Sequence, residues 1–309
     1  MRKISIRWAD SPSDISESDW NRHLERCPRA NPFHSWAFGE ATAAVEGFDI
    51  RRGMISGNND TIGLVQLFSR RIAPFCRHVK TIQGPVFDRT AILPEQIAAL
   101  QAIKKAYPAR KLNWCTLMPD LPDSEAVRSI LSDTGLNRIM AGYRTAWLDL
   151  RKSENDLMAG LDGKWRNQLR KAIQADLTVS FSDDPSWLLA RYEEHKKDIA
   201  YSGPPAAVLE RLRPEELCVA TASVDGAPAA AVLFIRTGNC ATYQVGWSNE
   251  ESRKRNAHNL LLWNGIMELK KQGVEAFDIG GVDPETAPGV AHFKAGLGGL
   301  PVTLAGTFI

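Results

Sequence analysis

The residues best suited to chemistry lie near the C-terminal end of the chain. Gly280 and Gly281 follow a strand-like run that ends at Ile279, and Lys294 precedes a second glycine-rich stretch, 296–299. A strand that ends in two glycines leaves space at its carboxyl edge, where α/β sheets commonly bind ligands. A lysine placed there can stabilise a developing oxyanion or bind a phosphate. Taken as an isolated pattern, such a lysine is more often a surface residue.

A basic segment, 164–171, forms a second candidate because it holds four cationic side chains and no acidic one. Helical spacing predicts that Trp165, Leu169 and Ile173 share one face, while the basic residues occupy the others. Such a helix can dock on a domain and offer bidentate arginine contacts to phosphates. A solvated amphipathic face explains the pattern equally well. The cationic residues of the segment are Lys164, Arg166, Arg170 and Lys171.

The elements that position these residues follow one plan that occurs twice. Each copy has the hydrophobic pattern of strand, tight turn, strand, strand, helix and strand, with Gly and Asn or Asp in the turn. In the first copy the elements are expected at 50–56, 61–69, 78–82, 94–106 and 112–116. In the second they are expected at 217–224, 229–236, 241–246, 257–271 and 276–279. The repeat predicts two mixed α/β (α+β) domains, 1–150 and 151–309.

Composition restricts the function classes. The net charge of +2 over 309 residues means that a nucleic-acid partner has to be held by a local basic patch. Five scattered cysteines without a CxxC pair, and histidines without metal-ligand spacing, predict reduced thiols and no metal site. The N-terminus lacks an apolar leader, and the apolar run 229–235 is too short to cross a bilayer. We therefore expect a soluble cytoplasmic protein without a transmembrane segment.

Several short segments, taken in order, resemble one known family. They are 164–172, 259–263, 277–281 and 293–299, with thinner N-terminal matches at 33–36 and 84–85. This set resembles the Fem family (FemAB-like aminoacyl-tRNA-dependent peptidyltransferases), which builds peptidoglycan cross-bridges in bacteria. The resemblance implies two tandem acetyltransferase-like (GNAT-like) domains, each a mixed twisted sheet flanked by helices. It also implies that the last strand, about 300–309, returns to pair with the first domain.

The resemblance further implies a reaction. An amine of a peptide or cell-wall precursor attacks the ester carbonyl of an aminoacyl-tRNA, and an amide forms without a covalent enzyme intermediate. Aminoacyl-tRNA is then a co-substrate, and no cofactor is expected. A lipid-linked acceptor would bring the protein to a membrane surface as a peripheral partner.

Residue roles follow from the same resemblance. Lys294 is expected to stabilise negative charge near the ester or the RNA end. Asp278 is expected to orient Lys294 or the amine, although a structural role at a strand end is an equally good interpretation. The expected substrate-binding residues are Phe293, Tyr243, Trp247, Gly280, Gly281 and Trp36. The expected tRNA- or phosphate-binding residues are Lys164, Arg166, Arg170, Lys171 and Arg253.

Other functions stay open. A coenzyme A-dependent N-acyltransferase acting on an envelope saccharide or small-molecule amine would need a glycine-rich turn for the pyrophosphate, and residues 252–260 contain no glycine. A non-catalytic relative that binds tRNA or a peptide is a third interpretation. Fem members that bind a nucleotide-linked peptide use basic residues in an N-terminal helix, but 38–44 has no Lys or Arg. A different acceptor amine therefore also stays open.

Overall fold

The computed structural model describes residues 2–9, 11, 14–74, 76–108, 114–199 and 203–309, apart from the side chains of 197–199. The chain forms two compact units, which we describe separately. Unit 1 comprises Met1–Arg144 and Val302–Ile309, and unit 2 comprises Thr145–Pro301. We had expected the boundary near residue 150. The strand just before that point belongs to the sheet of unit 2.

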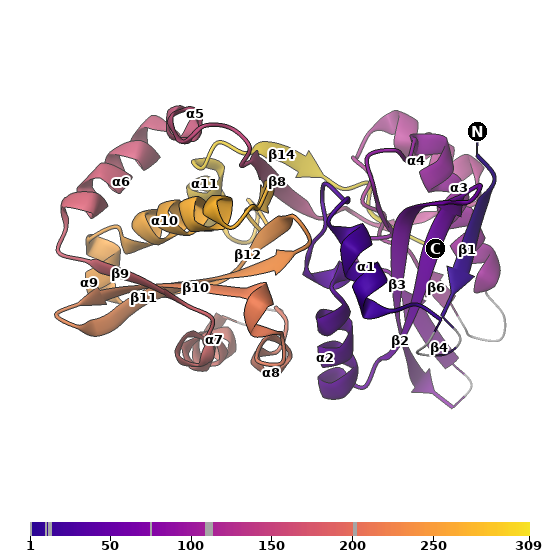
Figure 1. Cartoon of the computed structure of the whole chain (residues 1–309), viewed down its shortest axis with the longest axis horizontal. Helices are drawn as coiled ribbons and strands as arrows, with labels where there is room; N and C mark the ends of the chain where they lie inside the picture. Colours follow the sequence, from indigo (N-terminus) through magenta and orange to yellow (C-terminus); the bar gives the residue numbers. More distant parts are fainter. Residues whose placement is uncertain (1, 10, 12–13, 75, 109–113, 200–202) are drawn as a thin grey trace. The chain divides into compact units, whose positions relative to one another are not determined.

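Unit 1 contains a six-stranded sheet in the order β1-β2-β3-β4-β6, with β5 paired to β3 (Figure 1). Strands β1 to β4 are antiparallel, whereas β4 and β6 are parallel because helix α3 lies between them in the chain. The elements are β1 (Ile4–Trp8), α1 (Glu17–Leu24), η1 (Pro32–His34), α2 (Trp36–Glu46), β2 (Asp49–Gly57), β3 (Asp60–Ala73), β4 (Cys76–Lys80), β5 (Val86–Phe87), α3 (Leu93–Ala106), β6 (Trp114–Thr116), α4 (Glu125–Asp133), β7 (Arg138–Met140) and β15 (Thr307–Phe308). Residues 112–113, where the strand expected at 112–116 begins, lie outside the described residues.

Strand β15 confirms that the end of the chain returns to the first domain. It pairs antiparallel with β7. Leu117 and Phe308 also exchange backbone hydrogen bonds in both directions, each 2.8 Å long. The Phe308 side chain is 1% exposed in the core of unit 1, so the last residues of the chain are part of this core.

Unit 2 contains a seven-stranded sheet in the order β14-β8-β13-β12-β11-β10-β9. Helix α10 packs on one face of this sheet and α7 on the other (Figure 1). The elements are β8 (Arg144–Asp149), α5 (Glu154–Gly160), α6 (Gly163–Gln174), β9 (Thr178–Ser182), α7 (Ser186–Ile199), α8 (Ala206–Leu209), η2 (Pro214–Glu216), β10 (Leu217–Val224), β11 (Ala227–Thr237), β12 (Cys240–Ser248), α9 (Glu250–Lys254), α10 (Ala257–Lys271), β13 (Ala276–Asp278), α11 (Pro288–Ala295) and β14 (Leu300–Thr303).

The two sheets repeat one arrangement, as the sequence pattern predicts. Strands β2, β3 and β4 with α3 and β6 correspond in order and pairing to β10, β11 and β12 with α10 and β13. In unit 2 the first hairpin turns at Asp225 and Gly226, whose φ angles are 50° and 79°. Two consecutive positive φ angles are what a two-residue hairpin loop needs. The fold is therefore a pair of mixed α/β sheets.

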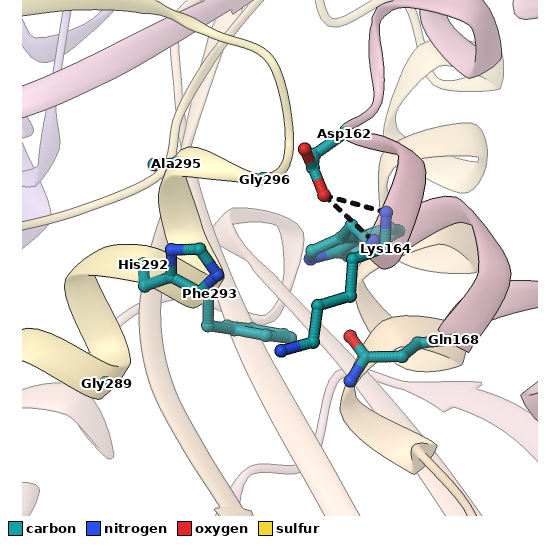
Figure 2. A pocket seen from close by; sticks show the side chains of 9 residues that line it. Asp162, Lys164, Gln168, Gly289, His292, Phe293, Ala295 and Gly296 are labelled. Carbon is teal, nitrogen blue, oxygen red and sulfur yellow. Dashed lines mark hydrogen bonds between the residues drawn. The ribbon is translucent and has the colours of Figure 1, made fainter.

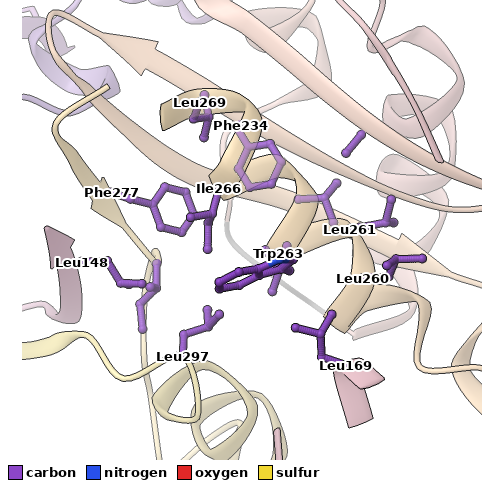
Figure 3. Packing of buried hydrophobic residues seen from close by; sticks show 14 of the residues in the cluster. Leu148, Leu169, Phe234, Leu260, Leu261, Trp263, Ile266, Leu269, Phe277 and Leu297 are labelled. Carbon is purple, nitrogen blue, oxygen red and sulfur yellow. The ribbon is translucent and has the colours of Figure 1, made fainter. Parts of the chain in front are cut away.

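The core of unit 2 lies between α10 and the sheet. Figure 3 shows Trp263 of α10 in this core, together with Phe234 of β11 and Phe277 of β13. Gly265 allows the helix to approach the sheet closely, since a Cβ at this position would collide with the ring of Phe234. This packing fixes both ends of α10 and the carboxyl end of β13, next to which the candidate site lies.

No described helix has the length and apolar character that crossing a membrane requires.

Candidate functional site

A buried carboxylate lies at the end of β13. Asp278 is 2% exposed, and its Oδ1 accepts hydrogen bonds from the Thr145 hydroxyl and from the backbone N–H of Gly280, the latter 2.9 Å long. Burial raises the pKa of Asp278, whereas these two hydrogen bonds and the charge of Lys294 lower it. Thr145 Oγ1 also lies 3.1 Å from the carbonyl oxygen of Gly280. The carboxylate therefore holds the backbone turn that follows β13.

A buried lysine is attached to the same turn. Lys294 of α11 is 8% exposed, and its ammonium donates a 2.9 Å hydrogen bond to the carbonyl of Gly281. The Nζ atom lies 4.9 Å from the ring centroid of Tyr243, within the range of a cation–π contact. Burial lowers the pKa of Lys294 to about 8, and the charge of Asp278 opposes this shift. Lys294 is thus still mainly protonated at neutral pH.

At position 280 only glycine fits. Its φ angle is +71°, which L side chains rarely adopt. A Cβ there would lie 2.6 Å from the backbone oxygen of Tyr243 and 3.1 Å from Nζ of Lys294. The absence of a side chain lets the turn bring Asp278, Tyr243 and Lys294 together.

A pocket of about 340 Å³ lies between the start of α6 and helix α11. Figure 2 shows Lys164 extending into it, towards Gln168 and Phe293. The ring of Phe293 lies 6.0 Å from that of Trp165, and the indole N–H of Trp165 is buried without a hydrogen-bond partner. The residues lining the pocket are Asp162, Lys164, Trp165, Gln168, Gly289, His292, Phe293, Ala295 and Gly296. The pocket combines aromatic walls with donors suited to an anionic or aromatic ligand.

Helix α6 positions one wall of the pocket. Its N-cap Asp162 accepts backbone hydrogen bonds from Lys164 and Trp165, which fixes where the helix begins. The prediction that Ile173 shares the buried face is wrong, since Ile173 is 58% exposed and Ala172 is buried instead. At roughly 100° per residue, a residue seven positions after Trp165 lies about 20° from its direction, whereas one eight positions after lies about 80° away.

Residues 163–295 match the family model of the acetyltransferase (GNAT) domain, which supports an acyltransferase activity. The structure of FemX superposes with a TM-score of 0.77 over 95% of each chain, at 14% sequence identity. The chain has the Fem-like tandem GNAT fold. At this identity the likeness establishes the fold alone.

Two further solved structures are similar to the chain over nearly its whole length. One is the C-terminal domain of a putative lysylphosphatidylglycerol synthetase from Agrobacterium fabrum, with 14% identity, a TM-score of 0.55 and coverage of 95% of this chain and 92% of that chain. The other is a tandem GNAT protein from the clavulanic acid biosynthesis pathway, with 14% identity, a TM-score of 0.55 and coverage of 99% and 98%. No curated protein sequence matches the chain significantly.

In unit 2, Trp247 and Tyr243 lie on opposite faces of the sheet. The Trp247 ring lies 5.5 Å from that of Trp187 on α7, and the Arg191 guanidinium lies over both indoles. Residue Gln244 forms a bulge in β12, because Leu233 pairs with Val245 and Phe234 pairs with Tyr243. Tyr243 consequently faces the α10 core, and Trp247 faces α7.

The remaining expected residues lie in three places. Trp36 is in unit 1. The Arg52 guanidinium lies 3.6 Å from the centroid of the Trp36 ring, and this ring packs edge-to-face with Trp20. Arg253 lies exposed on α9. On α6, Arg170 and Lys171 are exposed and Arg166 is half-buried, outside the set that lines the pocket.

Sequence reasoning missed two polar residues at this site. Thr145 lies 133 positions before its partner Asp278, and His258 packs edge-on against Phe293 at 6.3 Å. Neither residue belongs to a recognisable local motif. The one available signal for Thr145 is a hydroxyl at the start of an otherwise apolar strand pattern.

Asp278→Asn is expected to lower the pKa of Lys294 below about 8, because the carboxylate charge is what raises it. The side-chain oxygen that accepts from Thr145 is kept, so the turn is expected to persist. NMR titration of lysine side chains labelled with ¹³C at Cε measures the change. Asp149→Asn is the control, since Asp149 is a partly exposed carboxylate paired with Arg151. An unchanged Lys294 titration in Asp278→Asn would show that the two groups are not coupled.

Proposed function

We propose that the protein transfers an aminoacyl group from aminoacyl-tRNA to an amine of a peptide or cell-wall precursor and so forms an amide. The observation that carries this proposal is the buried Lys294 ammonium, held by the Gly281 carbonyl above the Tyr243 ring. A fixed cation in a site shielded from water stabilises developing negative charge far better than one in solvent.

The reaction balances without a covalent enzyme intermediate. The amine nitrogen forms a bond to the ester carbonyl carbon, and the carbonyl oxygen becomes an oxyanion. The bond from that carbon to the ribose oxygen then breaks, and the proton lost by the amine ends on the ribose oxygen. In this proposal Lys294 stabilises the oxyanion, and Phe293 and Tyr243 shape the space around it. Asp278 keeps Lys294 charged and fixes its turn.

The turn before α10 supports an RNA donor rather than coenzyme A. The chain reaches α10 through Arg255 and Asn256, and the φ angle of Asn256 is 56°. The guanidinium of Arg255 donates 2.8 Å hydrogen bonds to the carbonyl of Asp176 and to the Glu251 carboxylate. A turn filled by side chains does not offer the close backbone approach that a pyrophosphate needs.

The second candidate function is N-acyl transfer from coenzyme A to a small amine or saccharide. Its support is the match of residues 163–295 to the acetyltransferase (GNAT) domain. In that reaction Lys294 could stabilise a thioester-derived oxyanion in the same position. The two candidates therefore differ in the donor and not in the carbonyl chemistry.

The test compares donors on the purified protein. Retention of total charged tRNA is measured beside binding of acetyl-coenzyme A at one moderate salt concentration, with uncharged tRNA as the reference. We expect retention of charged tRNA, followed by loss of the amino acid to an added amine. Saturable binding of coenzyme A without retention of charged tRNA would overturn the aminoacyl-tRNA proposal in favour of the second candidate.

Arg166→Ala combined with Arg170→Ala is expected to weaken tRNA binding and to flatten its salt dependence. Losing two phosphate contacts should reduce the slope of log K against log salt by roughly 1.5. The matched control is Arg22→Ala with Lys271→Ala, which removes the same charge from exposed positions on α1 and α10. Equal slopes for the two double variants would show that α6 is a solvated helix face and does not contact the tRNA phosphates.

A further inference from the structure

His258 lies among the candidate site residues without an assigned role. His258 is the second residue of α10, and its Nε2 lies next to Gly246 on β12. A Cβ built on Gly246 would lie 2.7 Å from that Nε2 and closer still to the hydroxyl oxygen of Tyr243. The two polar atoms thus converge on one small space, which exists because residue 246 is glycine.

The same imidazole also supports Phe293. The two rings lie 6.3 Å apart at 86°, an edge-to-face arrangement that aromatic pairs favour. The other neighbour of Phe293 is the ring of Trp165 at 6.0 Å. Phe293 is therefore held between α10 and α6, with His258 as its α10 contact.

The opposite end of this arrangement is Lys294. Its ammonium lies over the face of the Tyr243 ring, whereas the hydroxyl of that ring lies next to Gly246, as does Nε2 of His258. Tyr243 therefore has its ring face towards the cation and its hydroxyl next to Gly246, where Nε2 of His258 also lies. A shift of the hydroxyl would tilt the ring on which Lys294 rests.

The charge state of His258 fits a neutral hydrogen-bonding role. Burial, with a smaller contribution from Arg253 on α9, lowers the pKa of His258 to about 4. A neutral imidazole has one N–H donor and one acceptor nitrogen, so it can pair with a phenol hydroxyl. A protonated imidazole would instead have two N–H donors and no acceptor nitrogen.

We propose that His258 is a positioning residue that hydrogen-bonds the Tyr243 hydroxyl through Nε2 and supports Phe293 through the edge-to-face contact of the two rings. It thereby holds Tyr243, whose ring lies beneath the Lys294 ammonium, and Phe293, which precedes Lys294 on α11. This inference rests on the proposed function for its kinetic consequence but not for the Tyr243–His258 pair itself. His258 contacts no reacting atom in this arrangement.

The pair is tested by ¹⁵N NMR of the histidine side chains. The His258 signals are assigned by their loss in His258→Gln. We expect a neutral imidazole at pH 7 whose Nε2 shift changes in Tyr243→Phe and stays the same in the control His195→Gln, which alters an exposed histidine on α7. An Nε2 shift that is unchanged in Tyr243→Phe would overturn the proposal.

The kinetic consequence is tested by a double-mutant cycle in the aminoacyl-transfer assay. Tyr243→Phe and His258→Phe are each expected to lower kcat by about tenfold with KM for the RNA unchanged, and the double variant by about the same factor. His258→Gln retains a polar atom near the position of Nε2 and should recover part of the loss. Multiplicative losses in the double variant would overturn the positioning role. Absence of transfer in the wild type together with the expected NMR shift would instead reject the proposed function and leave the Tyr243–His258 pair established.

Discussion

Lys294→Met is expected to lower kcat for aminoacyl transfer by about 10²–10³-fold, the usual loss when one preorganised oxyanion donor is removed. Methionine keeps the aliphatic part of the side chain but is one atom shorter and lacks the ammonium. The RNA affinity should change little, because the lysine is buried and the phosphate contacts proposed for α6 are separate. Single-turnover transfer from charged tRNA measures the effect. The control is Lys271→Met, an exposed lysine on α10 that is expected to leave kcat unchanged.

The pH dependence of the free energy of unfolding shows whether the Lys294→Met variant keeps the native fold around this position. Burial lowers the pKa of Lys294 from 10.5 to about 8, so the charged form opposes folding at neutral pH. Between about pH 8 and 10.5 the unfolded chain binds the extra proton, and this group's contribution to the free energy of unfolding therefore rises with pH. The wild type should gain stability relative to Lys294→Met across this window. Near-normal turnover in a variant with this behaviour would reject the catalytic role of Lys294.

Gly280→Ala is expected to lower kcat at least tenfold and to destabilise unit 2 by about 2–4 kcal/mol. The alanine has to adopt a positive φ angle, which costs roughly 1–2 kcal/mol, and its Cβ would press on the Tyr243 backbone and the Lys294 ammonium. Moving either group alters the site directly. Steady-state kinetics and urea unfolding measure the two effects.

Gly273→Ala is the matched control for this substitution. Gly273 has a φ angle of +84° at the end of α10, but nothing lies within 4 Å of a Cβ built there. It should therefore show the backbone strain alone, about 1–2 kcal/mol, with kcat unchanged. Equal loss of kcat in the two variants would mean that Gly280 matters only for backbone conformation and not for the placement of Lys294.

Turn residues and short hydrophobic patterns were sufficient to predict the repeated strands and helices from the sequence. Asp225 and Gly226 select a tight turn, and the apolar run from 229 onwards continues as β11. Helix α10 was expected at 257–271, the bounds that the structure has. These features depend on neighbours within a few positions, which is why single-chain patterns predict them.

The face of a strand or helix on which a side chain lies was less predictable, because a single bulge or a small angular offset changes it. Tyr243 and Trp247 are four residues apart, and strict alternation would place them on one face of β12. The bulge at Gln244 reverses the alternation, so they face opposite sides. On α6 the same kind of offset places Ile173 in solvent, and Ala172 completes the buried face.

The order of the chemical segments along the chain was sufficient to indicate the tandem GNAT fold and to name Lys294, Asp278 and Phe293 as candidate site residues. The geometry around Lys294 required the tertiary structure. Thr145 meets Asp278 from 133 positions away, and atoms of His258 and Tyr243 both lie next to Gly246. Contacts of this kind form only when separate elements pack, and burial then lowers the pKa of Lys294 to about 8. The residue types are local information, but their charge states and partners are products of the packed fold.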